Sequence, residues 1–211
     1  EITICEKGAL WLKVTTHGQT SHGAMPEKGV NAVIHMNKFL DKLLQYQFQY
    51  TESPSLGKPT MNIATLHGGF KTNVVPDRCE LTVDIRTVPG QVHKDIIADF
   101  QRMCDEEEIP EFKADIEVLS DRAAVETKAS DDFVRLCRDV QQDVTGRNPE
   151  PNGFMCYTDA AVFLPNTHIP LIVYGPGEQH MAHQPDEYIC LDRLYESVRF
   201  YAELAEKYLI D

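Results

Sequence analysis

The chain has 211 residues, of which 42% are apolar and 25% charged, a balance typical of a folded globular protein and not of a disordered one. Its formal net charge of −13 at pH 7 argues against nucleic acids and anionic membranes as partners. No apolar run reaches the roughly 20 residues of a membrane helix. The six cysteines contain no Cys-x-x-Cys pair, so we expect reduced thiols in a cytoplasmic protein.

The first half of the chain alternates between strand and helix patterns. Strand patterns cover four segments, 9–16, 61–66, 81–86 and 112–118. Apolar residues at helical spacing cover two more, 29–47 and 96–104. The resulting order is β-α-β-β-α-β. It predicts an α+β, ferredoxin-like fold with one antiparallel four-stranded sheet and two helices on one of its faces.

The rest of the chain is expected to have long helices and one strand. Ser130 is a candidate N-cap for the first helix, a short helix is expected over 159–164, and a long one begins near Leu191. The apolar run 171–174 predicts a strand buried on both faces, and therefore central in a parallel sheet. Because this part of the chain offers no adequate neighbouring strands, 121–211 is expected to be an incomplete α/β domain.

A loop rich in possible metal ligands follows that run. It reads Gly175-Pro176-Gly177-Glu178-Gln179-His180-Met181-Ala182-His183-Gln184-Pro185-Asp186-Glu187. Open α/β sheets bind their ligands at the carboxyl ends of strands, and imidazole nitrogen and carboxylate oxygen suit zinc or another divalent ion. A solvated surface loop can have the same composition, so the loop alone leaves both interpretations open.

Three further motifs precede this loop in a fixed order. Together with it they form a set of four: His17–Pro26 with Gly29–Ala32, His67–Gly69 with Thr72–Asp77, Asp84–Gly90, and Tyr157–Ala160 with the loop. Over the whole chain this set resembles the di-zinc amidohydrolase and exopeptidase family of acetylornithine deacetylase, succinyl-diaminopimelate desuccinylase, aminoacylase-1 and glutamate carboxypeptidase.

The resemblance implies a subunit of two domains. A catalytic α/β domain would hold two divalent ions, zinc or in its place cobalt or manganese, and an inserted ferredoxin-like lid would form a homodimer. It implies that 1–8 ends the first catalytic segment, that 9–120 is the lid and that 121–211 is the C-terminal catalytic segment. In such enzymes the general base and most metal ligands precede the lid. Because this chain holds none of them and starts at Glu1 without a methionine, we expect an inactive piece of a longer polypeptide.

The resemblance gives three lid residues a role. His22 matches a histidine that crosses the dimer interface and stabilises the oxyanion formed from the substrate carbonyl. Asn73 matches a residue that binds substrate from the partner subunit, and Arg86 one that contacts a substrate carboxylate. Each also has a structural interpretation: His22 can cap the following helix, Asn73 can form a turn, and Arg86 can pair with Asp84.

Four residues of the C-terminal part also receive roles. His183 is the one matched metal ligand, and Thr158, Gly175 and Gly177 match substrate-binding positions. A capping role for Thr158 and a tight turn at the two glycines are the structural alternatives. His180 has no matching role and is expected to be solvated.

The favoured function is therefore a metal-dependent hydrolase of amide bonds in small, carboxylate-bearing substrates. The alternative is a non-catalytic dimerisation module. Nucleic-acid binding is disfavoured by the charge and by the absence of an aromatic stripe on 81–86. Desuccinylase-like relatives carry an arginine soon after the Thr/Ser-Asp motif, whereas Ala160 follows Asp159 here, which leaves deacetylase, aminoacylase and dipeptidase open.

Overall fold

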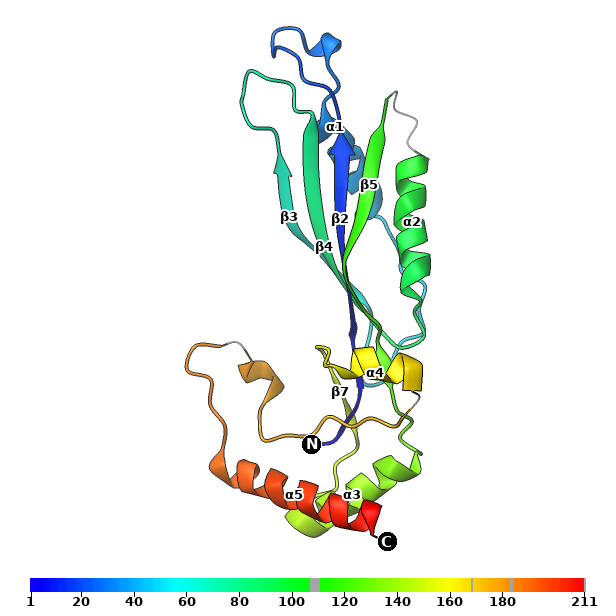
Figure 1. The fold of residues 1–211 in the computed structure, drawn as a ribbon, viewed down its shortest axis with the longest axis vertical. Coiled ribbons are helices and arrows are strands. Elements are labelled where there is room, and N and C mark those ends of the chain that lie inside the picture. Colours follow the sequence, from blue (N-terminus) through cyan, green and yellow to red (C-terminus); the bar gives the residue numbers. More distant parts are fainter. Residues whose placement is uncertain (107–110, 168, 183, 211) are drawn as a thin grey trace. The chain divides into compact units, whose positions relative to one another are not determined.

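The computed structural model describes residues 1–106, 111–167, 169–182 and 184–210, which form two compact units (Figure 1). One, which we call the sheet unit, comprises Gly8–Thr51 and Lys58–Ala123. The other, which we call the mixed unit because its strands run in both directions, comprises Glu1–Lys7, Glu52–Gly57 and Ala124–Asp211. The short segment Glu52–Gly57 thus belongs with the mixed unit, although the sequence placed it in the middle of the lid.

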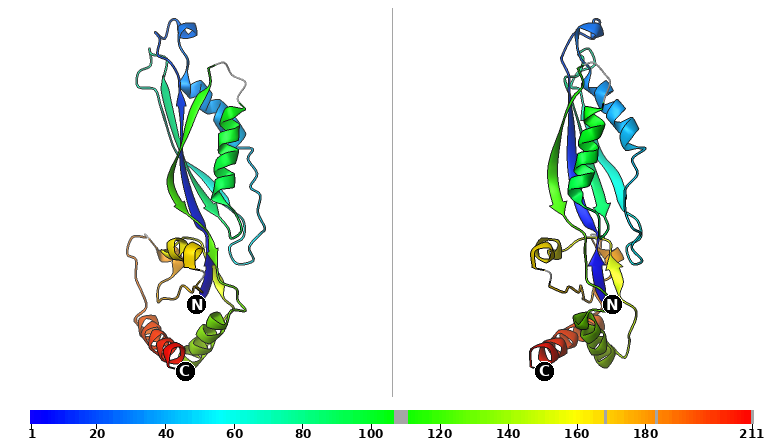
Figure 2. Two further views of the ribbon diagram at one scale, coloured as in Figure 1. Left: turned by 45° about the vertical axis from the view of Figure 1, so that its right-hand side comes forward. Right: turned by 90° about the vertical axis from the view of Figure 1, so that its right-hand side faces the viewer.

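The sheet unit has the ferredoxin-like plan. Its elements are β2 (Gly8–His17), the 3-10 turn η1 (Pro26–Lys28), α1 (Ala32–Leu43), β3 (Thr60–Gly68), β4 (Arg78–Thr87), α2 (His93–Asp105) and β5 (Lys113–Arg122). The strand order is β3-β4-β2-β5, and every neighbouring pair is antiparallel. Figures 1 and 2 show α1 and α2 on the same face of this sheet. The predicted fold class is confirmed.

The core of the sheet unit lies between the sheet and these two helices. Along β4, Leu81, Val83 and Ile85 are buried while the residues between them are half-buried, because successive side chains of a strand point to opposite faces. They share one apolar cluster with Phe39 of α1 and Phe100 of α2, whose ring centroids lie 6.0 Å apart in an edge-on contact. This cluster holds the helices to the sheet.

Within the described residues, the mixed unit has a small sheet and three α-helices. Its elements are β1 (Thr3–Glu6), β6 (Val125–Glu126), α3 (Asp132–Thr145), β7 (Asn152–Phe154), α4 (Ala160–Thr167), the 3-10 turn η2 (Gln179–Met181) and α5 (Leu191–Leu209). The strand order is β6-β1-β7, in which β6 runs antiparallel and β7 parallel to β1. Helices α3 and α5 pack together through Phe133 and Tyr208, whose ring centroids lie 5.3 Å apart.

Two sequence predictions for this unit are wrong. Helix α3 is capped by Asp131 and not by Ser130, because the Asp131 carboxylate accepts a hydrogen bond from the Phe133 N–H. The run 171–174 is not a buried parallel strand: Val173 forms a single antiparallel bridge with Thr3, and the run is half-buried. The short strand β1 is otherwise paired with β6 and β7, so little backbone remains to bond a longer neighbour.

No helix in the described part of the chain is long and apolar enough to cross a membrane. The six cysteines, all of which the structure describes, form no disulfide. The cytoplasmic location stays a prediction.

Candidate functional site

Two loops pair with each other at the end of the sheet unit where β2 and β3 finish. The Gly23 N–H donates to the Asn73 carbonyl at 2.9 Å, and the Val75 N–H donates to the Ser21 carbonyl at 2.9 Å. These bonds place His22 beside Asn73, although the two residues are far apart in the sequence. We call this end of the sheet unit the tip.

The pairing at the tip depends on glycine. A Cβ atom on Gly23 would lie 3.2 Å from the Asn73 backbone, and one on Gly18 would lie only 2.1 Å from the Val30 carbonyl oxygen. Any larger residue would force these backbones apart. The glycines of the first motif therefore have a structural reason that needs no ligand.

The imidazole of His22 is oriented by its own loop. Its Nδ1 accepts a hydrogen bond of 3.1 Å from the Ala24 N–H, and the side chain lies at an exposed position. Because a backbone N–H can only donate, Nδ1 of the neutral ring carries no proton and the ring proton sits on Nε2. His22 can therefore offer an N–H donor to a ligand.

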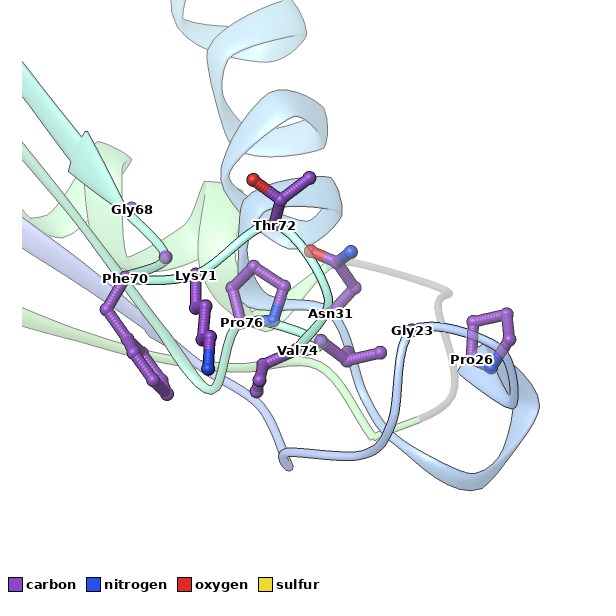
Figure 3. Close-up of a pocket in the computed structure, with 11 residues that line it drawn as sticks. Gly23, Pro26, Asn31, Gly68, Phe70, Lys71, Thr72, Val74 and Pro76 are labelled. Atoms are coloured by element: carbon purple, nitrogen blue, oxygen red, sulfur yellow. The ribbon is translucent and has the colours of Figure 1, made fainter.

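A cavity of about 550 Å³ lies at the tip (Figure 3). The segment 68–76 supplies most of its lining, and Gly23, Pro26 and Asn31 complete it. Asn31 is also the N-cap of α1, where its side-chain oxygen accepts hydrogen bonds from the first-turn N–H groups. Lys71 adds a positive charge to the lining.

Arg86 lies away from this tip. It pairs with Ala9 near the start of β2, whereas His22 and Asn73 follow the ends of β2 and β3. Its guanidinium forms an ion pair with the Asp84 carboxylate: Nη2 donates a hydrogen bond of 2.9 Å to Oδ2, and Nε lies 2.9 Å from Oδ1. The structure thus brings His22 and Asn73 together but not Arg86, and it forms the Asp84 pair of the structural interpretation.

The mixed unit holds Thr158 in a hydrogen-bond network at the start of α4. Its backbone N–H and its hydroxyl both donate to Oε2 of Glu6, at 3.1 and 2.9 Å. Its Oγ1 accepts a bond of 3.1 Å from the Ala160 N–H. Thr158 therefore also has the capping geometry of the structural interpretation.

Glu6 is a functional candidate that the sequence alone did not reveal. It is fully buried at the end of β1, and its second oxygen, Oε1, has no hydrogen-bond partner among the described residues. Burial raises the pKa of this carboxyl and the charge of Asp159 adds to that rise, while the donors of Thr158 and the Ala161 N–H offset it only in part. The only available signal was a glutamate at the end of a strand, directly before the Lys7-Gly8 pair.

Gly175 and Gly177 line a second cavity, of about 970 Å³, within the mixed unit. Neither has a positive φ, and a Cβ atom on either would meet nothing within 4 Å. In this structure neither the backbone conformation nor the available space requires glycine at these two positions. His180 of the same loop has a side chain 73% exposed and lies 3.7 Å from Glu178, which agrees with the expected solvated position.

A comparison of the chain with models of protein families shows to which family it belongs. Residues 4–111, just over half of the chain, match the model of the M20 peptidase dimerisation domain. The chain belongs to the M20 peptidase family. The resemblance found in the sequence motifs is thereby confirmed, and the matched residues contain the whole tip.

Named relatives agree with the M20 assignment. The chain is 28% identical over 197 residues to an acetylornithine deacetylase of Myxococcus xanthus, covering 89% of this chain and 50% of that protein. The structure of aminopeptidase PepT from Bacillus cereus superposes with a TM-score of 0.76 at 21% identity, covering 98% of this chain and 53% of that one. The M20 metallo-carboxypeptidase Sso-CP2 from Sulfolobus solfataricus gives a TM-score of 0.76 at 18% identity, with 99% and 60% covered. These two structures show the shared fold alone, and the chain spans about half the length of the curated relatives it matches.

A metal shell does not form within the described part of this M20 chain. No group of three or more histidine, cysteine, aspartate or glutamate side chains is placed there to hold an ion. His183, the predicted ligand, lies outside the described residues. A zinc shell needs three or four protein ligands, so the described residues do not provide one by themselves.

Proposed function

We propose that this chain is part of a metal-dependent hydrolase that cleaves the amide bond of N-acyl amino acids or small peptides. In this proposal 9–120 is the dimerisation lid, 121–211 is the C-terminal segment of the catalytic domain, and 1–8 ends the segment before the lid. Membership of the M20 family and the deacetylase and peptidase names of its relatives support it. The substrate class is a small amide with a free carboxylate, and the acyl group stays open among deacetylase, aminoacylase and dipeptidase types.

The observation that carries the proposal is the distance, within one sheet unit, between Arg86 and the pair His22 and Asn73. From Arg78 to Arg86, strand β4 covers roughly 26 Å at 3.3 Å per residue. His22 and Asn73 lie beyond its first residue and Arg86 lies near its last. A small substrate cannot touch both ends of the same sheet unit. If His22, Asn73 and Arg86 all contact one substrate molecule, one chain must supply His22 and Asn73 and a second chain must supply Arg86. The active form is then a homodimer with shared sites.

The outer edge of β3 offers the surface for this dimer. Strand β3 is at one edge of the sheet, and Leu66 on it is 51% exposed; Ile34 of α1 and Phe70 after β3 add exposed apolar side chains. An open strand edge with apolar neighbours favours pairing with a second copy. Leu66→Lys should raise the dimer dissociation constant at least about tenfold by sedimentation. Val118→Lys, at an exposed position of the opposite edge strand β5, should leave it unchanged.

The chemistry assigned to this chain is binding and charge stabilisation. His22, with its proton on Nε2, would donate to the substrate carbonyl oxygen as that oxygen becomes negative, and Asn73 would bind beside it. Arg86 would hold the substrate carboxylate. Two divalent ions, zinc or in its place cobalt or manganese, would supply activated water when bound, and His183 is the residue here that would hold one.

Mixed dimers test this arrangement in the natural full-length protein. His22→Ala should lower kcat by roughly 10²–10³-fold with little change in KM, because its contact strengthens in the transition state. His183→Ala should lose metal, and added zinc or cobalt should partly restore activity. Mixing the two variants should regenerate activity, since one site per heterodimer receives both native residues. Mixtures no more active than the parent variants would contradict the shared site.

A second candidate is a non-catalytic dimerisation module. It is favoured by the finding that no metal-binding group forms within the described residues. The two proposals differ in zinc content: a full-length protein that is dimeric, folded and free of bound zinc after dialysis against the metal would support the module. Zinc retained near two ions per subunit would support the hydrolase.

A further inference from the structure

Glu6 and Thr158 are separated by 152 positions in the sequence, yet two hydrogen bonds join them in the mixed unit. Glu6 is 0% exposed. Its Oε2 receives both donors of Thr158, and Oε1 receives none among the described residues. A buried carboxylate oxygen is costly unless it is hydrogen-bonded, so these two bonds stabilise Glu6 and fix Thr158 at the same time.

The direction of each hydrogen bond follows from the donors available. The Ala160 N–H can only donate, so Thr158 Oγ1 accepts it. The hydroxyl proton of Thr158 therefore points to Glu6 Oε2. The same oxygen also accepts the Thr158 N–H, so Oε2 is the acceptor of both Thr158 donors.

The Thr158 hydroxyl has one lone pair left. Its proton is engaged by Glu6 and its other lone pair by Ala160, while the side chain remains only half-buried and reachable. In this state it can accept a hydrogen bond from a ligand, but it cannot donate one.

We propose that Glu6 is a positioning residue that fixes Thr158 as a hydrogen-bond acceptor, so that the substrate group at Thr158 is an N–H donor. The enzyme would then prefer secondary amides and disfavour tertiary amides, whose nitrogen carries no hydrogen. This inference rests on the proposed function, in which Thr158 contacts the substrate. It adds a residue, Glu6, and a rule for the substrate.

Four variants separate positioning from general stability. Glu6→Gln keeps an acceptor oxygen in the place of Oε2, whereas Glu6→Leu removes it at similar volume. Thr158→Val removes the hydroxyl without changing the shape of the side chain. The control is Thr167→Val, at the other end of α4, where the hydroxyl donates to the Phe163 carbonyl at 2.8 Å.

The first measurement is amide hydrogen exchange on the 211-residue chain, which requires no activity. Glu6→Leu should speed exchange of the Thr158 amide about tenfold, and Thr158→Val should do the same for the Ala160 amide, since each loses its acceptor. Glu6→Gln and Thr167→Val should change both amides by less than about twofold. An unchanged Thr158 amide in Glu6→Leu would overturn the positioning role.

The second measurement uses the metal-loaded full-length protein. It compares kcat/KM for N-acetylalanine and for N-acetyl-N-methylalanine, which lacks the N–H. The preference for the first should fall about fivefold in Thr158→Val and fall also in Glu6→Leu, but persist in Glu6→Gln and Thr167→Val. A preference unchanged in Thr158→Val would overturn the substrate rule. Turnover of neither amide by the native enzyme would contradict the proposed function and the rule with it, while the exchange measurement would still decide the role of Glu6.

Discussion

The sheet unit and the mixed unit differ in how completely they cover their apolar side chains. In the sheet unit, two helices cover one face of four strands, and the cluster between them is buried. In the mixed unit, α5 packs on α3 with one face and leaves Leu191, Tyr195 and Val198 more than 60% exposed at helical spacing. Exposed stripes of this kind mark contact surfaces. The mixed unit thus exposes an apolar helix face, which in the proposed function the rest of the catalytic domain would cover.

The largest effect is expected when one aromatic side chain is removed from each unit. Phe100 is 0% exposed in the sheet unit, so Phe100→Ala should cost about 3–5 kcal/mol of unfolding free energy through the cavity that it leaves. Phe163 of α4 is 58% exposed, so Phe163→Ala should change it by less than about 0.5 kcal/mol. Urea unfolding measures both. Equal losses would contradict the contrast.

The glycines provide a second test. Gly18→Ala puts a Cβ atom 2.1 Å from the Val30 carbonyl oxygen and should cost about 1–3 kcal/mol of stability. Gly177→Ala places its Cβ in open space and should leave the stability of the isolated chain nearly unchanged. If the full-length protein nevertheless loses substrate affinity in Gly177→Ala, the reason for that glycine lies in the bound ligand.

A smaller effect concerns the pH dependence of the mixed unit. Burial raises the pKa of Glu6, so the folded chain keeps this proton at pH values where the unfolded chain has released it. The contribution of neutral Glu6 is fully present below the ordinary glutamate pKa and is lost as pH rises from there through the raised pKa. Glu6→Gln should remove this decline as pH rises above about 4, and Glu206→Gln, at an exposed position of α5, should retain it. Urea unfolding across this pH range measures it.

The smallest perturbation is modification of the thiols. Cys156 and Cys190 are exposed and both belong to the mixed unit, whereas the other four cysteines are buried. Burial raises the pKa of Cys5 to about 11 and that of Cys137 to about 12, which keeps both protonated and unreactive. A thiol reagent should therefore modify two cysteines in the folded chain and six in urea. Rapid reaction of a third in the folded chain would show that a buried region opens.

Strand and helix periodicity predicted the sheet unit well because its pattern is local. The alternation along β4 shows in the sequence which side chains are buried, and the spacing in α1 shows which face packs on the sheet. The run 171–174 was misread because an apolar tetrapeptide does not show how many neighbours a strand has. The tip motifs were found as motifs, but only the pairing of two loops shows that His22 and Asn73 are adjacent.

By itself, the sequence determined the ferredoxin-like order of elements, the M20 resemblance and the identity of the tip residues, since these depend on local pattern and motif order. Only the tertiary structure placed Asn73 beside His22, Arg86 away from both, and Thr158 on buried Glu6. Contacts of this second kind join residues by strand register and by side-chain direction. A shift of one residue would break them while leaving composition and periodicity intact, so no local pattern records them.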